Sequence, residues 1–491
     1  MLCLTAPRVL LLMLAAMAVS HAQRVPDVFT LRGSSLLPGA SQALSPAATA
    51  TQEAGSARPG VVDLSQAWRM ALNHDYRYKA AVSERLAAQT ARQQGRAGLL
   101  PQIQAGYLRG RVSGTITQFN FSGRDVSSDI SYDSSNAYVQ LQQTLLDYGR
   151  YAGYRRGIAV ADEGAATFMA RQQETGSRLA AAYFNVLLAH NRRALQRARI
   201  AALAQRHEGL KARYARNAGT TTAVRETAAR LAVAKADEIV VHDELVVAAR
   251  ELQSMLGFAP DSVVGPGGDF PLQSPQPASL DEWLRRARVN NPSARAAREA
   301  VSVAQAELDQ AKSEYWPTVS LVASYSNADS ENLSTLSQRS NTFMVGIHVA
   351  IPIFTGGYTT ANVARAREVY RQRQHELAAA GEKALADATR QYTNVVDGAQ
   401  RIRALQSAVA SGELSVDAAR KAFSYGVGSN LDVLDELDVL FEARSQLEQT
   451  RLEYLLARLQ LERVVGELES SDFDLINELY LSKPVALDIS R

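Results

Sequence analysis

The sequence predicts a mixed α and β membrane protein in which strands lead directly into very long helices. Odd positions of residues 343–353 carry large apolar side chains and even positions are mostly small or polar, the pattern of a strand with one apolar face. Residues 358–424 follow a Thr-Gly-Gly break and are rich in Ala, Arg, Gln, Glu and Leu, which predicts one helix of about 100 Å. The same order of elements occurs twice in the chain. Such a pattern is not typical of a globular enzyme and indicates a structure that spans a barrier.

Composition and charge narrow the class of protein. The chain has 491 residues, of which 46% are hydrophobic and 21% charged, so wholesale disorder is excluded. The formal net charge is +3, with Lys and Arg scattered along the chain. No basic patch typical of nucleic-acid binding is present.

The N-terminus is typical of an exported protein. Arg8 precedes an apolar run at 9–19, and Ser20-His21-Ala22 is a small-x-small cleavage site, so residues 1–22 are predicted to be a signal peptide. The single cysteine, Cys3, lies within it. The mature chain is therefore expected to have no thiol, no disulfide and no cysteine ligand for a metal, and Cys3 is not placed to carry a lipid anchor.

The rest of the chain is predicted to consist of two structural repeats. Leu64 matches Leu280, and Leu100-Pro101 matches Trp316-Pro317, both at an offset of 216 residues. Each repeat reads as helix, strand, loop, strand, very long helix, turn and helix. The predicted organisation is a signal peptide at 1–22, a flexible lead segment at 23–60, a first repeat at 62–256, a Pro- and Gly-rich connector at 257–279, a second repeat at 280–470 and a C-terminal tail at 471–491.

In the first repeat one helix is expected from about 62 to 98, with strands at 102–114 and 138–145. The Ser-, Asp- and Gly-rich residues 115–136 between these strands are interpreted as a polar loop, which holds the extra residues of this repeat.

Four strands of about ten residues suit a tilted crossing of a bilayer. No later segment is apolar enough for a transmembrane helix, so the chain is expected to enter the membrane as strands with an apolar outer face and a polar inner face. Four strands cannot close a barrel, and open edges in hydrocarbon cost several kcal/mol for each unpaired backbone group. Oligomerisation is therefore expected. The alternative is a soluble all-α protein with incidental hairpins, which is disfavoured because the apolar face is so long.

These features together resemble the TolC family of outer-membrane factors. The resemblance rests on the repeat, on Leu100-Pro101 and Trp316-Pro317, on Ile351-Pro352-Ile353-Phe354-Thr355-Gly356-Gly357, and on Tyr425-Gly426-Val427-Gly428 before Asp432-Val433-Leu434-Asp435. It implies a homotrimer in the outer membrane of a Gram-negative bacterium. In such a trimer, four transmembrane strands from each protomer form a twelve-stranded barrel that continues into a periplasmic α-helical barrel. The implied partners are a periplasmic adaptor (membrane fusion) protein, an inner-membrane ABC transporter, an exported protein substrate and outer-membrane lipid.

The resemblance also implies the residues of a gate. Asp432 and Asp435 match aspartates that line the narrowest part of the channel, and Tyr425 matches a gate tyrosine. The periplasmic tip turns are assigned to Gly219, Thr220, Gly428, Ser429 and Asn430. The simpler alternatives are that the aspartates stabilise the helix start and that Tyr425 only packs.

This sequence departs from the family at the tip. The first repeat has Ala223 where the second has Asp432, both turns are short, and an arginine often found in the second turn is missing. Fewer polar links are therefore expected to hold the closed tip, and Ser429 and Asn430 stand in the place of that arginine.

Enzyme motifs are missing from the sequence. It has no Gly-x4-Gly-Lys-[Ser/Thr] loop and no His-Glu-x-x-His pair, and its seven histidines are dispersed. Neither catalysis, nor a cofactor, nor a metal is predicted. The first functional hypothesis is type I secretion of an unfolded protein, with a repeats-in-toxin protein such as cyclolysin as the candidate cargo. The second is small-molecule efflux in a tripartite pump, and the third is a structural periplasmic coiled coil without transport.

Overall fold

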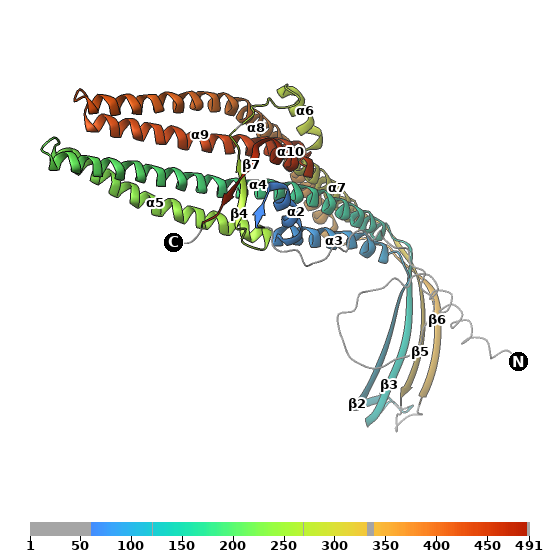
Figure 1. Cartoon of the computed structure of the whole chain (residues 1–491). Coiled ribbons are helices and arrows are strands. Elements are labelled where there is room, and N and C mark those ends of the chain that lie inside the picture. The colour runs from blue at the N-terminus through green and yellow to red at the C-terminus, as the bar shows by residue number, and fades with distance from the viewer. Residues whose placement is uncertain (1–59, 120, 269, 331–337, 489–491) are drawn as a thin grey trace, which may run out of the picture. The chain divides into compact units, whose positions relative to one another are not determined.

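A computed structural model describes residues 60–119, 121–268, 270–330 and 338–488 (Figure 1). The predicted signal peptide at 1–22 lies outside the described residues, as does the predicted lead segment apart from Gly60. The repeat boundaries at 62–256 and 280–470 remain predictions.

A four-stranded antiparallel sheet forms one part of the described chain. Its strands are β2 (Gln102–Phe119), β3 (Asp125–Leu146), β5 (Thr318–Ser330) and β6 (Gln338–Ala350), in the order β2-β3-β5-β6. The predicted strand at 343–353 is observed as β6, but β6 ends at Ala350. Pro352 follows closely and has no backbone N–H to donate, which accounts for the earlier end.

The polar loop predicted at 115–136 is wrong. Residues 115–119 belong to β2 and residues 125–136 to β3, and the two strands pair as far as Phe119 and Asp125. Polar side chains link across the ribbon: Thr115 Oγ1 donates to Asp129 Oδ1 at 2.9 Å, and the Thr117 and Ser127 hydroxyls are 2.9 Å apart. Cross-strand pairs of this kind stabilise a strand whose composition alone is typical of a loop.

Two very long helices follow the two hairpins. They are α4 (Tyr148–Ala215) and α8 (Tyr358–Ser424), and the bounds of α8 are those predicted. Gly356 and Gly357, at φ 63° and 84°, turn the chain from β6 into α8 in a conformation that favours glycine. After each long helix the chain reverses, into α5 (Thr221–Leu256) and α9 (Asn430–Val465).

Shorter helices precede each hairpin. The single helix expected at 62–98 is two helices, α2 (Leu64–His74) and α3 (Tyr76–Ala97). Asp75 is extended between them; its carboxylate accepts from the backbone N–H of Arg77 at 3.0 Å and pairs with Arg178, so it ends one helix and caps the next. In the second half α6 (Leu280–Asn290) and α7 (Pro292–Ser313) separate at Asn291 in the same way.

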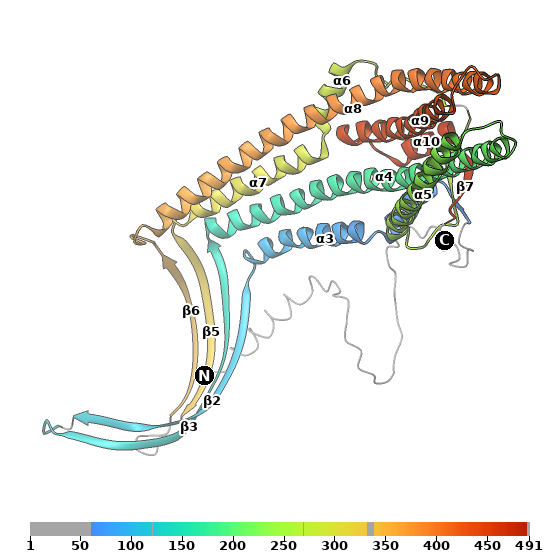
Figure 2. The same cartoon turned by 90° about the vertical axis from the view of Figure 1, so that its left-hand side faces the viewer.

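The helices that join the strands lie in the same order as the strands. Helix α3 packs on α4, α4 on α7, and α7 on α8, while β2 pairs with β3, β3 with β5, and β5 with β6. Figure 2 shows these four helices side by side, each continuing from one strand of the sheet. Sheet and helical layer therefore end at matching edges, β2 with α3 on one side and β6 with α8 on the other.

A small sheet that the sequence analysis did not predict brings three distant parts of the chain together. It contains β1 (Val61–Val62), β4 (Ser262–Pro266) and β7 (Leu481–Ala486), in the order β1-β4-β7, and so draws on both the connector and the C-terminal tail. The Tyr183 hydroxyl accepts from the Val264 N–H at 2.9 Å within the main hydrophobic core. Helix α10 (Ser470–Tyr480) adds Phe473 and Ile476 to the same core.

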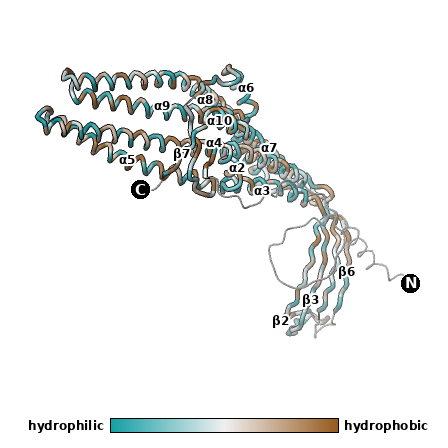
Figure 3. Tube along the Cα trace, viewed as in Figure 1, coloured by the Kyte–Doolittle hydropathy of each residue, from teal (hydrophilic) through white to brown (hydrophobic). Residues whose placement is uncertain are grey.

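Hydrophobic and hydrophilic residues are interspersed along the long helices (Figure 3). None of the helices in the described ranges combines the length and the apolar character needed to cross a membrane.

Candidate functional site at the ends of the long helices

Both long helices reverse direction through short turns. The first turn joins α4 to α5 and contains Asn217 at φ 56°; the second joins α8 to α9 and contains Gly426 at φ 78°. Figure 1 shows both turns at the same end of the helices. Thr220 caps α5, because its Oγ1 accepts from the Ala223 N–H at 3.3 Å.

Four of the five residues predicted for the turns lie there. Gly219 and Thr220 precede α5, and Gly428 and Ser429 precede α9. Asn430 does not belong to the turn: it is the first residue of α9 and is buried, with 6% of its surface exposed. Asn430 therefore contacts the interior instead of replacing an arginine at the tip.

Asp432 forms a capping box with Ser429. Its carboxylate accepts the Ser429 N–H at 2.7 Å, and its own N–H donates to Ser429 Oγ at 3.1 Å. The backbone hydrogen bond from Ser429, together with the one from its side chain, lowers the pKa of Asp432 below its usual value. The carboxylate stays exposed, so stabilising the helix start leaves its charge accessible to solvent.

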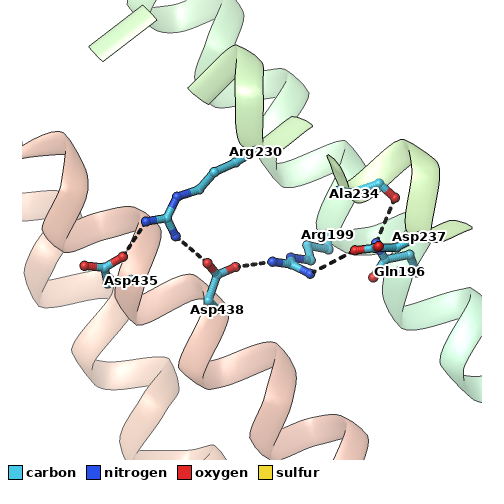
Figure 4. A network of polar contacts seen from close by, with 7 residues as sticks. All are labelled: Gln196, Arg199, Arg230, Ala234, Asp237, Asp435 and Asp438. Carbon is cyan, nitrogen blue, oxygen red and sulfur yellow. Dashed lines mark hydrogen bonds and ion pairs between the residues drawn. The ribbon is translucent and has the colours of Figure 1, made fainter. Parts of the chain in front are cut away.

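Asp435 and Asp438 connect α9 to α4 and α5 (Figure 4). Arg230 of α5 donates to Asp435 Oδ1 at 2.6 Å and also bonds Asp438. Arg199 of α4 donates to the other oxygen of Asp438 at 2.6 Å. Burial lowers the pKa of Arg230, but the hydrogen bonds and charges of the two aspartates outweigh it, so the net shift is upward. Asp435 is thus paired within its own chain.

The same network continues along the first half. Arg199 lies 4.0 Å from Asp237 of α5, and Gln196 donates to the carbonyl oxygen of Ala234 at 2.8 Å. The sequence analysis missed Arg199 and Arg230. The available signal was the spacing of Asp435 and Asp438, because residues three apart lie on one helix face and can share a cation.

Asn430 and Phe423 anchor the second turn on α4. Arg206 Nε donates to Asn430 Oδ1 at 2.8 Å, and Asn430 Nδ2 donates to the Thr227 hydroxyl at 3.2 Å. The Arg206 and Arg213 guanidinium groups lie 4.4 and 4.8 Å from the centre of the Phe423 ring. Burial, followed by the charges of Arg420 and Arg213, lowers the pKa of Arg206. The links expected from the turns come instead from the faces of α4 and α5.

Tyr425, predicted as a gate residue, directly follows α8 as its C-cap and has 82% of its surface exposed. Between the helix pairs runs a groove of about 890 Å³, lined at one point by Arg199 and Asp438 and elsewhere by Phe441 and Gln446. In the described ranges no three His, Cys, Asp or Glu side chains come together as metal ligands do. The arrangement is a set of ion pairs and hydrogen bonds that can hold or release two helix pairs.

Comparison with known proteins places this geometry in a family. The family model described as outer membrane efflux protein matches residues 68–258 and 283–467. The alkaline protease secretion protein AprF of Pseudomonas aeruginosa is 32% identical over 85% of this chain and 87% of that protein. The proteases secretion protein PrtF of Dickeya chrysanthemi is 31% identical over 88% of this chain and 93% of that protein. The outer membrane protein TolC of Vibrio cholerae is 26% identical over 84% of this chain and 92% of that protein.

Solved structures share the fold at low identity. The outer membrane protein VceC of Vibrio cholerae superimposes with a TM-score of 0.69 at 18% identity, covering 83% of this chain and 97% of that one. The Campylobacter jejuni CmeC outer membrane channel gives a TM-score of 0.70 at 15% identity, covering 85% of this chain and 89% of that one.

Proposed function

This chain belongs to the outer membrane efflux protein family, and we propose that it is the outer-membrane channel of a type I secretion system. The protein is an outer-membrane channel of the TolC type with a long periplasmic helical part. In the proposed role it forms the exit duct for an unfolded protein. An inner-membrane ABC transporter supplies the energy, and a periplasmic adaptor connects the two.

The observation that supports the channel assembly in this proposal is the pair of matching open edges. The sheet ends at β2 and β6, and the helical layer ends at α3 and α8. One face of the sheet is apolar and exposed in the single chain; Ile347 is 67% exposed and Phe343 64%. An apolar face suits lipid, but edges with unpaired backbone groups do not. Copies that join β6 to β2 and α8 to α3 satisfy both requirements.

We take the number of copies to be three. This number is what the likeness to the TolC family implies, and three copies of four strands give a barrel of twelve. The helices that continue from these strands then extend the wall into the periplasm, α4 and α8 over about 100 Å each. The turns at the far end of the helices form the gate, with Asp432, Asp435 and Tyr425 facing the constriction.

The proposed cargo is a secreted protein. AprF and PrtF, which match most of this chain, are named for the secretion of proteases, and this supports a protease-type cargo. Protein CyaE of Bordetella pertussis is 31% identical but covers 48% of this chain and 50% of that protein. The expectation of cyclolysin as cargo is not confirmed, so the toxin stays the second choice of protein cargo.

Deletion of the gene tests the transport role. The expected result is that at least one protein disappears from the culture medium and accumulates in the cell. Wild-type protein supplied in trans restores its export. An unchanged set of secreted proteins would contradict the secretion role.

Small-molecule efflux is the alternative within the same family. Its support is the family description and the solvent efflux pump outer membrane protein SrpC of Pseudomonas putida, which is 26% identical over 36% of this chain. The same deletion strain separates the two roles. Loss of resistance to solvents or drugs with intact protein secretion would favour efflux.

A further inference from the structure

The β2–β3 hairpin extends well beyond the four-stranded sheet. In the described part of the chain, pairing between β3 and β5 reaches Ser134 and Ser330, whereas β2 and β3 continue together to Phe119 and Asp125. The residues of this extension, together with Leu108 and Asn136 at its base, are called the outer hairpin (108–119 and 121–136). At the usual rise per residue, the part beyond the sheet reaches about 30 Å. Figure 2 shows it curving strongly past the ends of β5 and β6.

Within the sheet, the two faces of this hairpin have the polarity of a membrane barrel. Partners in the antiparallel register share a face. One face carries apolar residues, and the other carries polar ones such as Gln104, paired with Gln140. The residues of the apolar face are Ile103, Ala105, Tyr107, Ala137, Val139 and Leu141. In the proposed barrel this face meets lipid, and the glutamine face lines the lumen.

The polarity inverts in the outer hairpin. The face that continues the apolar one is now polar, with Arg111 opposite Asp133 and Thr115 opposite Asp129. The face that continues the glutamine side becomes apolar, and its large side chains are Leu108, Val112, Ile116, Val126, Ile130 and Tyr132. Leu108 is 70% exposed and Val126 50% in the single chain.

The apolar face also has open positions beside its large side chains. Gly110 and Gly114 flank Val112 on the same face, and a Cβ at either glycine would meet nothing within 4 Å. A side chain from another molecule can therefore approach next to Val112. Among the described residues, neither edge of the ribbon pairs with another strand beyond Ser134.

We propose that the apolar face of the outer hairpin packs against the same face of the outer hairpins of the other copies, closing the outer mouth of the channel. The proposal rests on the proposed oligomeric channel. In it, every copy raises its hairpin from the same rim, with the apolar face continuing the lumen side. Continuity with the sheet thus directs these faces toward one another, and the reach of the ribbon lets them meet.

The identity of the occupant follows from the side on which the apolar face lies. Lipid would require apolar residues on the opposite face, where Arg111, Thr115, Asp129 and Asp133 lie. If the mouth were open and filled with water, polar residues such as Gln104 and Gln140 would be expected to continue along the lumen side. Packing between copies buries the apolar side chains that are exposed to water in the single chain.

Cysteine cross-linking on whole cells tests the contact directly, because the sole native cysteine, Cys3, lies in the predicted signal peptide. Ile116→Cys places a thiol on the apolar face of the outer hairpin. Thr117→Cys, at the next position in the chain, places a thiol on the opposite, polar face. Mild oxidation is expected to join two copies through Ile116→Cys and to leave Thr117→Cys unlinked. Equal linking of both variants, or linking of neither, would overturn the proposal.

Conductance tests the closing role. Oxidised Ile116→Cys channels in planar bilayers are expected to conduct less than the reduced ones, with full recovery after reduction. As a second variant, residues 112–132 are replaced by Asn-Gly, a pair that favours a tight hairpin turn. Both variants are measured in an Arg230→Ala background, in which the gate at the helix ends is weakened, and there the shortened protein should conduct severalfold more than the full-length one. The closure of the outer mouth by the outer hairpins is called the cap. Conductance that is unchanged both on oxidation of Ile116→Cys and on shortening of the hairpin would overturn the cap.

The proposed channel and the proposed cap fail in different ways. If wild-type protein in isolated outer membranes gives no oligomer with an amine-reactive cross-linker, the channel assembly itself is wrong. If the oligomer forms but Ile116→Cys does not link copies, the assembly stands and the cap is overturned.

Discussion

The ends of the long helices and the outer hairpin present opposite chemistry. At the helix ends, polar groups that range from the buried Asn430 to the exposed Asp435 are paired within one chain, as in Arg230 with Asp435 and Arg206 with Asn430. In the outer hairpin, polar pairs lie on one face and an unpartnered apolar face, including Val112 and Val126, is exposed.

The difference indicates how each end responds to its surroundings. Ion pairs are directional, weaken with salt and can exchange partners when another protein docks. Apolar contact is insensitive to salt and non-directional. We therefore expect the helix ends to act as a switch and the outer hairpin to act as a passive closure.

The largest effect is expected from Arg230→Ala. Two links are lost in each copy, and each exposed link contributes about 0.2–1 kcal/mol. Over three copies this totals about 1–6 kcal/mol, roughly tenfold or more in the ratio of closed to open channels. Resting conductance in planar bilayers should rise accordingly. Arg225→Ala is the control, an exposed arginine on the same helix; an equal rise in both would contradict the role of Arg230.

Salt separates the two ends without a mutation. At about 1 M salt the Debye length falls to about 3 Å, so the ion pairs of Asp435 and Asp438 weaken. Conductance of wild-type channels, corrected for bulk conductivity, should rise with salt. In Arg230→Ala channels the corrected value should rise less, because, of the ion pairs that these aspartates make in the described part of the chain, only the one between Arg199 and Asp438 remains to be weakened. A salt response of the same size in both would place the switch elsewhere.

Ion selectivity should depend more on Asp432 than on Asp435. Asp432 keeps an exposed carboxylate, whereas Asp435 is paired with Arg230. Reversal potentials should show a clear loss of cation selectivity in Asp432→Asn and a smaller loss in Asp435→Asn. The pKa of Asp432 is lowered by its hydrogen bonds to Ser429, so the carboxylate stays ionised above its usual pKa of 3.8.

The sign of the pH effect follows from that lowered pKa. The capping contribution of Asp432 is present above the unfolded-state pKa and is lost as pH falls through the lower folded-state value. Wild-type selectivity should therefore be constant from pH 8 to pH 5. A loss of selectivity within that range, in wild type but not in Asp432→Asn, would show that the Asp432 carboxylate takes up a proton there. That outcome would contradict its lowered pKa.

The smallest effect is expected from Tyr425→Phe. The tyrosine is 82% exposed in the single chain, so its hydroxyl matters only through another copy, at about 0.5–1.5 kcal/mol for one hydrogen bond. Resting conductance and sensitivity to large antibiotics should rise modestly. Wild-type conductance with intact secretion would leave Tyr425 a packing residue.

The sequence predicted best where local signals agree. The bounds of α8 follow from a glycine pair at its start and from a long helix-forming segment without proline. It failed at residues 115–136, because a Ser- and Asp-rich composition is typical of a loop and the cross-strand bonds that support these strands are not visible in a window of sequence.

The candidate site was partly predictable for the same reason. The turns and the capping aspartate have local signatures, and Gly428, Ser429 and Asp432 lie where expected. Arg230 and Asp435 are 205 residues apart in the chain, and a pair at that separation becomes visible only after the helices are packed.

The measurement that most directly tests the account is native mass spectrometry of the protein extracted from isolated outer membranes. The account predicts an assembly of three copies in this fraction, because the open edges at β2 and β6 must be closed by other copies in lipid. A monomer found in the soluble periplasmic fraction would contradict it.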